Sequence, residues 1–225
     1  MGADSYDSYN YKGFTINVEQ DPDPWNPRDD DNLTVMACFH KRYVLGDKGH
    51  GLDIDDYSGW DEMLAAITKK HKPAVIAQLF LYDHSGLSIK IGSFNGLLPQ
   101  GHAEFDSGPV GFIWITKEAA RKEYGWKKLT KSRIAQLQKY IEGDVQTYDD
   151  YLSGSVYGYI IVDSDGNPID DGGRWGFYGD ESVQENGYAI QEAKGIIDQE
   201  IRSRIRAALP ENNPAQMTLG LEGIS

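Results

Sequence analysis

The stretch VGFIWI, residues 110–115, is the most apolar run in the chain, and the fold is inferred outward from it. An apolar run without polar alternation predicts a strand buried on both faces, which lies in the interior of a sheet. After this run, Thr116 is placed to cap a short basic helix that ends at Gly125. Thr130 is placed to cap a second helix, whose apolar residues recur on one face. We therefore predict a central strand followed by two helices.

Two pairs of apolar, β-branched stretches flank clusters of turn-forming residues. The first pair comprises residues 74–82 and 87–91, and the second comprises residues 155–162 and 169–177. Such pairs are typical of β-hairpins. A last helix with a clear apolar stripe follows the second pair, and Pro210 stops it.

The N-terminal part contributes two more predicted strands, residues 14–19 and 33–39. We expect them to form a hairpin across the long acidic loop between them. A helix is expected to begin after Ser58, which can cap it, and to end before Pro73.

Hairpins with interspersed helices predict an α+β fold, in which an antiparallel or mixed β-sheet carries helices on one face. The length of 225 residues allows a sizeable core. We predict a flexible N-terminal lead-in at 1–13, a single domain over 14–209, and a disordered C-terminal tail at 210–225.

Cys38 is the only cysteine, so no disulfide can form within the chain. Burial as a small hydrophobe is the favoured interpretation. A catalytic thiol is the alternative, because His40 would share the face of Cys38 in a strand.

No apolar stretch is long enough to span a membrane and the N-terminus is acidic, so a cytoplasmic protein is expected.

The sequence carries no recognisable catalytic, cofactor or metal motif. The five histidines lack metal-ligand spacing, and no phosphate-binding glycine loop is present. We expect no cofactor and no bound metal, and a binding protein is favoured over an enzyme. An enzyme with a carboxylate site at Asp53, Asp55, Asp56 and Asp61 stays open as an alternative, although acidic residues before a helix also suit its dipole.

The net charge of −13 is unevenly distributed. Eight Lys and Arg residues lie between Lys117 and Lys139, against Glu118 and Glu123. A basic helix pair of this kind could contact phosphates and stack a base on an aromatic ring. The candidate nucleic-acid-binding residues are Arg121, Lys122, Trp126, Lys127, Lys128, Lys131 and Arg133.

The acidic loops support a different hypothesis, in which the protein imitates nucleic acid instead of binding it. Carboxylates on a rigid surface could imitate phosphates and occupy the DNA-binding groove of another protein. Solubility charge on long loops is the alternative. The candidate partner-binding residues are Asp21, Asp23, Trp25, Asp29, Asp30, Asp31, Asp53, Asp55 and Asp56.

Five strings resemble an uncharacterised protein family carried by bacteriophages, plasmids and other mobile elements. They are LYDHSGLSI (81–89), DSGPVGFIWITKE (106–118), YGWKKLTKSR (124–133), TYDDYLSGSVYGY (147–159) and RWGFYG (174–179). The similarity spans roughly residues 14 to 200 in order. It implies a bacterial host cell and, because small acidic proteins of such elements often counter host defence, an anti-restriction or anti-CRISPR-like role.

Beyond Pro210, residues 216–221 read QMTLGL. This stretch resembles the Gln-x-x-Leu-x-Leu peptide by which bacterial DNA-processing proteins bind the DNA sliding clamp. The candidate clamp-binding residues are Gln216, Met217, Leu219 and Leu221, with an incidental tail as the alternative.

Two functional hypotheses follow from the sequence. The leading one is a non-enzymatic mobile-element protein that binds and modulates a host defence nuclease or nucleic-acid-processing protein through its acidic loops. The alternative is a phage DNA-metabolism accessory protein that binds nucleic acid through the basic helix pair and the sliding clamp through its tail. Direct nucleic-acid binding is the less favoured of the two, because the overall charge is negative.

Overall fold

The computed structural model describes residues 6–98, 105–169 and 173–208. The chain divides into two compact units, each treated by itself below. Unit 1 comprises residues 1–19, 158–175 and 181–225, and unit 2 comprises residues 20–157 and 176–180. The prediction of a single domain stays a prediction, because units that share strands can unfold together or separately.

Unit 2 contains a four-stranded antiparallel sheet in the order β3-β6-β4-β5. The strands are β3 (Val35–Cys38), β4 (Pro73–Asp83), β5 (Leu87–Ile91) and β6 (Ser107–Thr116). The apolar run 110–115 lies in β6, which pairs with both β3 and β4. The prediction of an interior strand is therefore confirmed.

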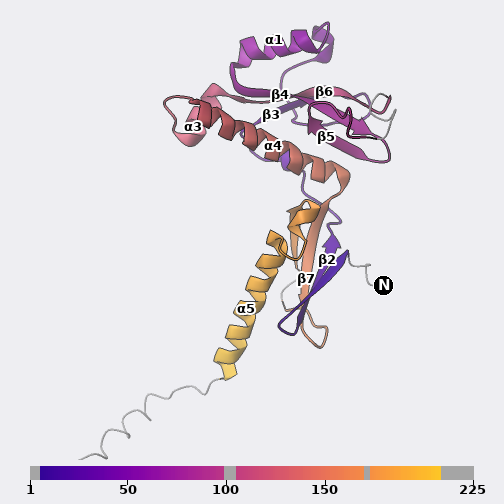
Figure 1. The fold of residues 1–225 in the computed structure, drawn as a ribbon, viewed down its shortest axis with the longest axis vertical. Helices are drawn as coiled ribbons and strands as arrows, with labels where there is room; N and C mark the ends of the chain where they lie inside the picture. Colours follow the sequence, from indigo (N-terminus) through magenta and orange to yellow (C-terminus); the bar gives the residue numbers. More distant parts are fainter. Residues whose placement is uncertain (1–5, 99–104, 170–172, 209–225) are drawn as a thin grey trace, which may run out of the picture. The chain divides into compact units, whose positions relative to one another are not determined.

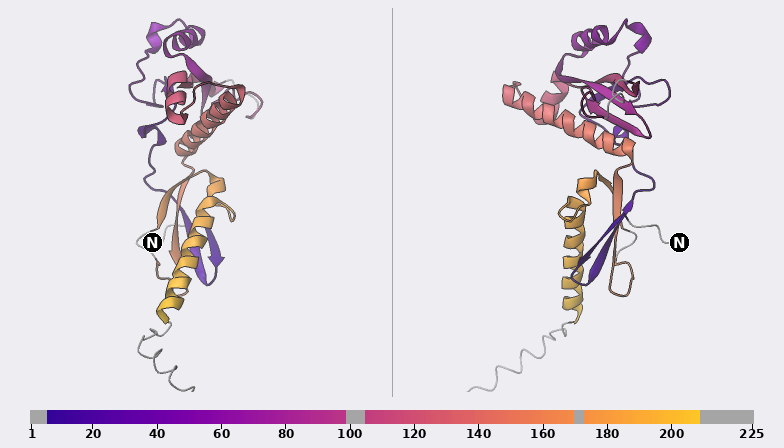
Figure 2. Two further views of the ribbon diagram at one scale, coloured as in Figure 1. Left: turned by 90° about the vertical axis from the view of Figure 1, so that its left-hand side faces the viewer. Right: turned by 45° about the vertical axis from the view of Figure 1, so that its right-hand side comes forward.

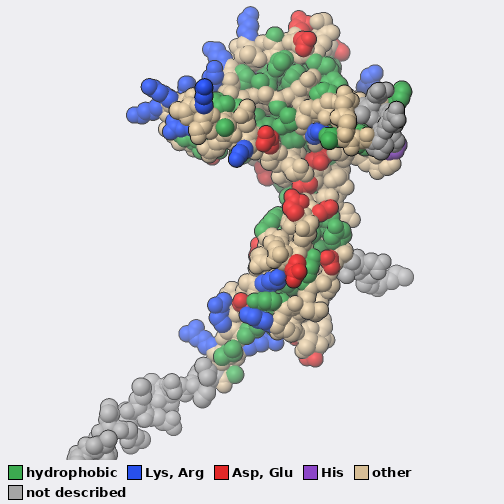
Figure 3. Space-filling view, in the orientation of Figure 1, with side chains coloured by type: hydrophobic (Ala, Val, Ile, Leu, Met, Phe, Trp, Pro, Cys, Tyr) green, Lys and Arg blue, Asp and Glu red, His purple; other side chains and the backbone are tan. Residues whose placement is uncertain are grey.

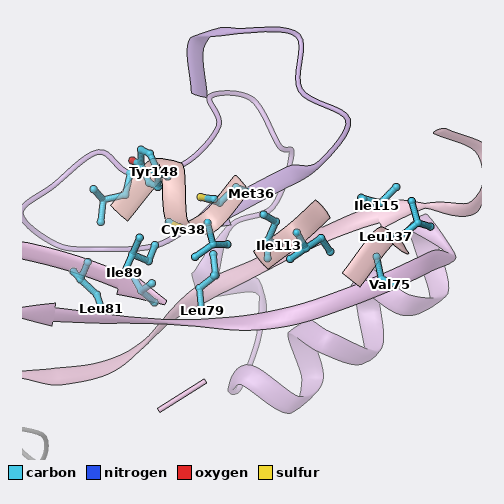
Figure 4. Close-up of a cluster of buried hydrophobic side chains, with 14 of the residues drawn as sticks. Met36, Cys38, Val75, Leu79, Leu81, Ile89, Ile113, Ile115, Leu137 and Tyr148 are labelled. Atoms are coloured by element: carbon cyan, nitrogen blue, oxygen red, sulfur yellow. The ribbon is translucent and has the colours of Figure 1, made fainter. Parts of the chain in front are cut away.

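Helices lie on both faces of this sheet, with α1 (Trp60–His71) on one face and α3 (Lys117–Tyr124) and α4 (Lys131–Ser153) on the other (Figure 1). Alternate residues of β6 face the two layers, as strand geometry requires. Ile113 and Ile115 belong to the cluster beneath α4, whereas Phe112 and Trp114 lie with α1. Figure 4 shows the larger cluster, in which Leu137 of α4 meets the sheet.

Unit 1 is built on a second antiparallel sheet in the order β1-β2-β7-β8. Its strands are β1 (Asp7–Tyr11), β2 (Phe14–Gln20), β7 (Val156–Val162) and β8 (Arg174–Tyr178), the last three of which continue into unit 2. Helix α5 (Tyr188–Ala208) runs along one face of this sheet (Figure 2). Short 3-10 helices η1 (Pro27–Asp29), η2 (Ile54–Asp56) and η3 (Asp180–Ser182) complete the described elements.

The α+β class and its antiparallel sheets are confirmed, as are both central hairpins, β4–β5 and β7–β8. The described residues form two sheets where the sequence suggested one. In unit 1, a helix lies on one face of the sheet, as the sequence predicts. In unit 2, α1 adds a second helical layer on the other face of the sheet.

The predicted hairpin between residues 14–19 and 33–39 is wrong. Strand β2 pairs instead with β1, which forms within the predicted flexible lead-in. The turn between β1 and β2 places Lys12 and Gly13 at positive φ, as a two-residue hairpin turn requires. A tight turn fixes the pairing register locally, whereas the long loop before β3 does not.

Ser58 is not the N-cap of α1 either. Gly59 occupies that position, and Ser58 donates its backbone N–H and its hydroxyl to the Glu62 carboxylate at 2.7 and 2.6 Å. Thr116 and Thr130 do cap α3 and α4, because their hydroxyls accept backbone N–H groups of the first turn. These two predictions are confirmed.

Candidate nucleic-acid interface

Three segments that are distant in sequence meet at one end of the unit 2 sheet. Strand β4 begins at Pro73, directly after α1, and its first residue pairs with Thr116 at the end of β6. The backbone N–H of Lys117 donates to the carbonyl of Lys72 at 3.3 Å. The last turn of α1 therefore adjoins the first turn of α3.

This arrangement gathers the positive charge of unit 2. Ten Lys and Arg residues in the last turn of α1, in α3 and around the start of α4 stand against Glu118 and Glu123. We call them the basic surface, and Figure 3 shows Lys and Arg side chains gathered over part of unit 2. They are Lys69, Lys70, Lys72, Lys117, Arg121, Lys122, Lys127, Lys128, Lys131 and Arg133, all exposed except the half-buried Arg133.

Seven of these ten residues are predicted from the sequence as basic members of the helix pair from Lys117 onward. Lys69, Lys70 and Lys72 are not predicted, since they lie far away in the chain. Cations in the last turn of a helix are favoured by its dipole, so their sequence pattern carries no signal of a site. Only the pairing of β4 with β6 brings them beside α3.

The two aromatic residues at the junction of α3 and α4, at the basic surface, are already engaged in ring contacts. Tyr124 and Trp126 stack on each other, with ring centroids 4.4 Å apart and an interplanar angle of 16°. The guanidinium of Arg133 lies over the Trp126 ring at 5.0 Å, and it also donates to the Lys128 carbonyl at 2.7 Å. A base could stack on the Trp126 face that Tyr124 covers only by displacing Tyr124.

Some carboxylates of the acidic segment before β3 form contacts within the protein. Asp21 accepts the backbone N–H of Gly176 at 3.2 Å, and Asp29 pairs with Lys48 at 3.3 Å. Asp23, Asp30 and Asp31 are exposed. The segment therefore retains surface charge, but it is not a uniform row of unpaired carboxylates.

Trp25 lies in the same segment with 61% of its surface exposed. Its indole N–H donates to Asp30 at 3.3 Å, and its carbonyl accepts the Tyr178 hydroxyl at 2.5 Å. These contacts hold an exposed aromatic side chain in one place.

A buried Arg28 organises the two acidic loops. Its guanidinium lies 2.7 Å from Asp47 and 2.9 Å from Asp144, and Thr34 bonds both Arg28 and Asp144. The Arg28 side chain is fully buried, so the charges are compensated by direct pairing. No pattern in the sequence indicates this network, because the three charged residues lie far apart in the chain.

The second acidic loop does not form a metal site in the described structure. Asp53 accepts the N–H of Asp55 as the N-cap of η2, and Asp53, Asp55 and Asp56 are all exposed. Within residues 6–98, 105–169 and 173–208, no group of three His, Cys, Asp or Glu side chains could hold a metal ion.

Cys38 is buried in β3, as its apolar surroundings predict. Burial, together with the smaller effect of the nearby Asp47 carboxylate, raises the pKa of its thiol to about 12. The thiolate is the nucleophilic form, so these surroundings do not support the catalytic thiol alternative.

The candidate clamp-binding residues Gln216, Met217, Leu219 and Leu221 lie outside the described residues.

Comparisons of the chain with family models, with curated proteins and with solved structures found no match. In the part of the chain that the structure describes, every helix is too short or too polar to cross a lipid bilayer.

Proposed function

We propose that the protein binds nucleic acid through the phosphate backbone and that the basic surface is its contact. The observation that carries this proposal is the convergence of ten cations from three separate segments at one end of unit 2. Lys and Arg side chains that neutralise phosphates provide most of the affinity of sequence-independent binding. Helix starts at α3 and α4 add N-terminal dipoles of the favourable sign.

The overall negative charge does not oppose this binding at physiological salt. Exposed charges are screened over about 8 Å at 0.15 M ionic strength, so a phosphate at the basic surface interacts chiefly with nearby cations. Glu118 and Glu123 are the two carboxylates within the same segments. The local excess of positive charge therefore governs contact, whereas the net charge of −13 opposes only the long-range approach at low salt.

The test is the binding of a fluorescently labelled duplex and a labelled single strand of equal length, measured by anisotropy over a series of salt concentrations. We expect the affinity to fall steeply with salt. The double variant Lys127→Glu with Lys128→Glu should bind at least roughly tenfold more weakly and show a salt slope lower by about 2.

The matched control is Arg202→Glu with Arg206→Glu on α5, which changes the net charge equally at exposed positions of unit 1. It should leave the affinity nearly unchanged. Equal losses for both double variants would show that only total charge matters, and no binding by the unaltered protein would refute the proposal.

A second candidate function is binding of a basic groove on a host nucleic-acid-processing or defence protein, by imitation of DNA. The specific observation that favours it is Trp25, an exposed side chain fixed by Asp30 and Tyr178 among acidic residues. Rigid aromatic anchors often dominate binding energy at interfaces.

This second function is tested by affinity capture from a bacterial lysate with the unaltered protein and with Trp25→Ala. A nuclease or defence subunit recovered by the first and lost with the second would support the inhibitor role. Such a subunit should also release its DNA when the protein is added. Capture that does not depend on Trp25 would contradict this candidate.

A further inference from the structure

A groove lies in unit 2 away from the basic surface, beneath the segment that follows β3. Its volume is about 1020 Å³, which is slightly above the range of roughly 300–1,000 Å³ typical of small-molecule sites. The lining residues come from positions 38–50 and from Ile54. We call this feature the loop groove.

The first part of the segment that forms the loop groove, residues 39–46, is held in place at both ends. At its start, the Phe39 N–H donates to the Val110 carbonyl at 2.7 Å. At its end, Gly46 bridges to Ala37 and donates its N–H to the Tyr148 hydroxyl at 2.9 Å. A Cβ on Gly46 would lie 2.6 Å from the Met36 carbonyl oxygen, so only glycine fits there. This part of the groove wall is therefore held in place by contacts with neighbouring elements.

The walls of the loop groove are largely apolar. Val44 is 88% exposed and Ile54 is 41% exposed, although both are aliphatic. The Phe39 and His50 rings meet edge to face with centroids 5.2 Å apart. Burial lowers the pKa of His50, which favours its uncharged ring, although the nearby Asp47 carboxylate acts in the opposite direction.

The exposed charges that line the loop groove are positive. They belong to Lys41, Arg42 and Lys48. Asp47 is the one carboxylate among the described lining residues, and it is engaged by buried Arg28. Lys48 pairs with Asp29, and Arg42 pairs with Asp83, but their side chains are 77% and 67% exposed. Such exposed pairs contribute about 0–1 kcal/mol, so these cations can exchange partners.

From this combination we infer that the loop groove binds a long-chain carboxylate, with the aliphatic chain against Val44 and Ile54 and the carboxylate at Lys41 and Lys48. The apolar walls select a ligand with an aliphatic body. The cations select a negative head group, because a cationic head would meet like charges and a neutral head would gain no ionic contact. This site is separate from the basic surface and does not depend on the proposed nucleic-acid binding.

The test is calorimetric titration of the full chain with three amphiphiles of equal chain length, all below their micelle concentrations. They are dodecanoate, dodecanol and dodecyltrimethylammonium. We expect saturable binding of dodecanoate with one site, binding of dodecanol at least roughly tenfold weaker, and no saturable binding of the ammonium compound. Equal binding of all three would overturn the assignment of an anionic ligand, and binding of none would overturn the site.

Two variants locate the ligand. Val44→Asp places a carboxylate on the exposed wall and should abolish dodecanoate binding without unfolding the protein, because the side chain is 88% exposed. The matched control is Ile205→Asp on α5, where the side chain is 57% exposed, and it should bind as the unaltered protein does. Lys41→Glu should weaken dodecanoate binding and leave dodecanol binding unchanged.

A second copy of the chain is the competing occupant of the loop groove. Sedimentation at increasing protein concentration distinguishes it, because a ligand site predicts no association through this face. A dimer that Val44→Asp dissociates, combined with dodecanoate binding only to the monomer, would reassign the groove to self-association and overturn the proposal.

Discussion

The carboxylate of Asp149 accepts a hydrogen bond from the backbone N–H of Ile89 at 2.6 Å. Ile89 lies in the edge strand β5, and Asp149 projects from α4. At the other edge of the sheet, Asp47 forms the corresponding contact with the N–H of Met36 at 2.9 Å. Each edge of the unit 2 sheet thus has a backbone donor occupied by an aspartate, which removes a site for pairing with another chain.

Asp149 should make the stability of the protein depend on pH. Burial raises the pKa of the Asp149 carboxyl in the folded state, although the bond from Ile89 acts in the opposite direction. Between the unfolded value near 3.8 and the raised folded value, the folded state binds more protons. The contribution of Asp149 to stability is therefore present below about pH 3.8 and is lost as the pH rises through the folded value.

We expect Asp149→Asn to be at least as stable as the unaltered protein at pH 7, because the amide oxygen can still accept the Ile89 N–H without a buried charge. Asp149→Ala should lose about 1–3 kcal/mol, because that N–H then lacks its partner. Urea unfolding over a range of pH measures both. A stability difference between Asp149→Asn and the unaltered protein that does not vary with pH would contradict the assignment.

Removing the buried guanidinium of Arg28 should be strongly destabilising. Arg28→Met leaves Asp47 and Asp144 facing each other without a cation, and breaking a buried ion pair costs about 3–5 kcal/mol. Chemical denaturation provides the measurement. Lys48→Met is the matched control, because its pair with Asp29 is exposed and should contribute below about 1 kcal/mol. Similar losses for the two variants would show that the Arg28 network is not structural.

Gly111 allows β6 to approach β3 closely. A Cβ at this position would lie 1.9 Å from the Ala37 carbonyl oxygen, which neither backbone can accommodate. Gly111→Ala should therefore cost about 4 kcal/mol or more, observed as a large decrease in Tm or as failure to fold.

The matched control for Gly111→Ala is Gly143→Ala, the same substitution at a glycine with free space around it. Gly143 lies in α4, and a Cβ there meets nothing within 4 Å. It should stabilise the helix by about 0.5–1 kcal/mol, because alanine is the better helix former. A folded, stable Gly111→Ala protein would show that the β3–β6 contact differs from the one described.

The thiol of Cys38 should be unreactive in the folded protein. Its pKa of about 12 keeps it protonated at pH 8, and its side chain is buried. A colorimetric disulfide reagent should label it only after denaturant is added. Rapid labelling without denaturant would show an accessible, activated thiol and would restore the catalytic alternative.

Much of the local structure could be predicted from the sequence because its signals are local. The caps Thr116 and Thr130, the apolar run in β6 and the turns of both central hairpins each depend on neighbouring residues. Loops carry weaker signals. The predicted pairing of residues 14–19 with 33–39 was wrong, because the tight turn at Lys12 and Gly13 pairs β2 with β1, and no local pattern connects β3 to β6.

The candidate interface likewise combines a feature that is visible in the sequence with features that only the fold creates. The basic helix pair from Lys117 to Arg133 can be recognised in the sequence as a run of positive charge. The addition of Lys69, Lys70 and Lys72 depends on strand pairing between residues more than forty positions apart. The covering of Trp126 by Tyr124 and Arg133 likewise required side-chain positions.

The sequence by itself determined the composition of the core, the helix boundaries at the threonine caps and the uneven distribution of charge, because each follows from residue type and short-range spacing. Only the tertiary structure decided which charges are available to a partner. It buried Arg28 with Asp47 and Asp144 and left the basic surface exposed. The physical reason is that the desolvation and pairing of a charge depend on neighbours that the fold brings together, not on neighbours along the chain.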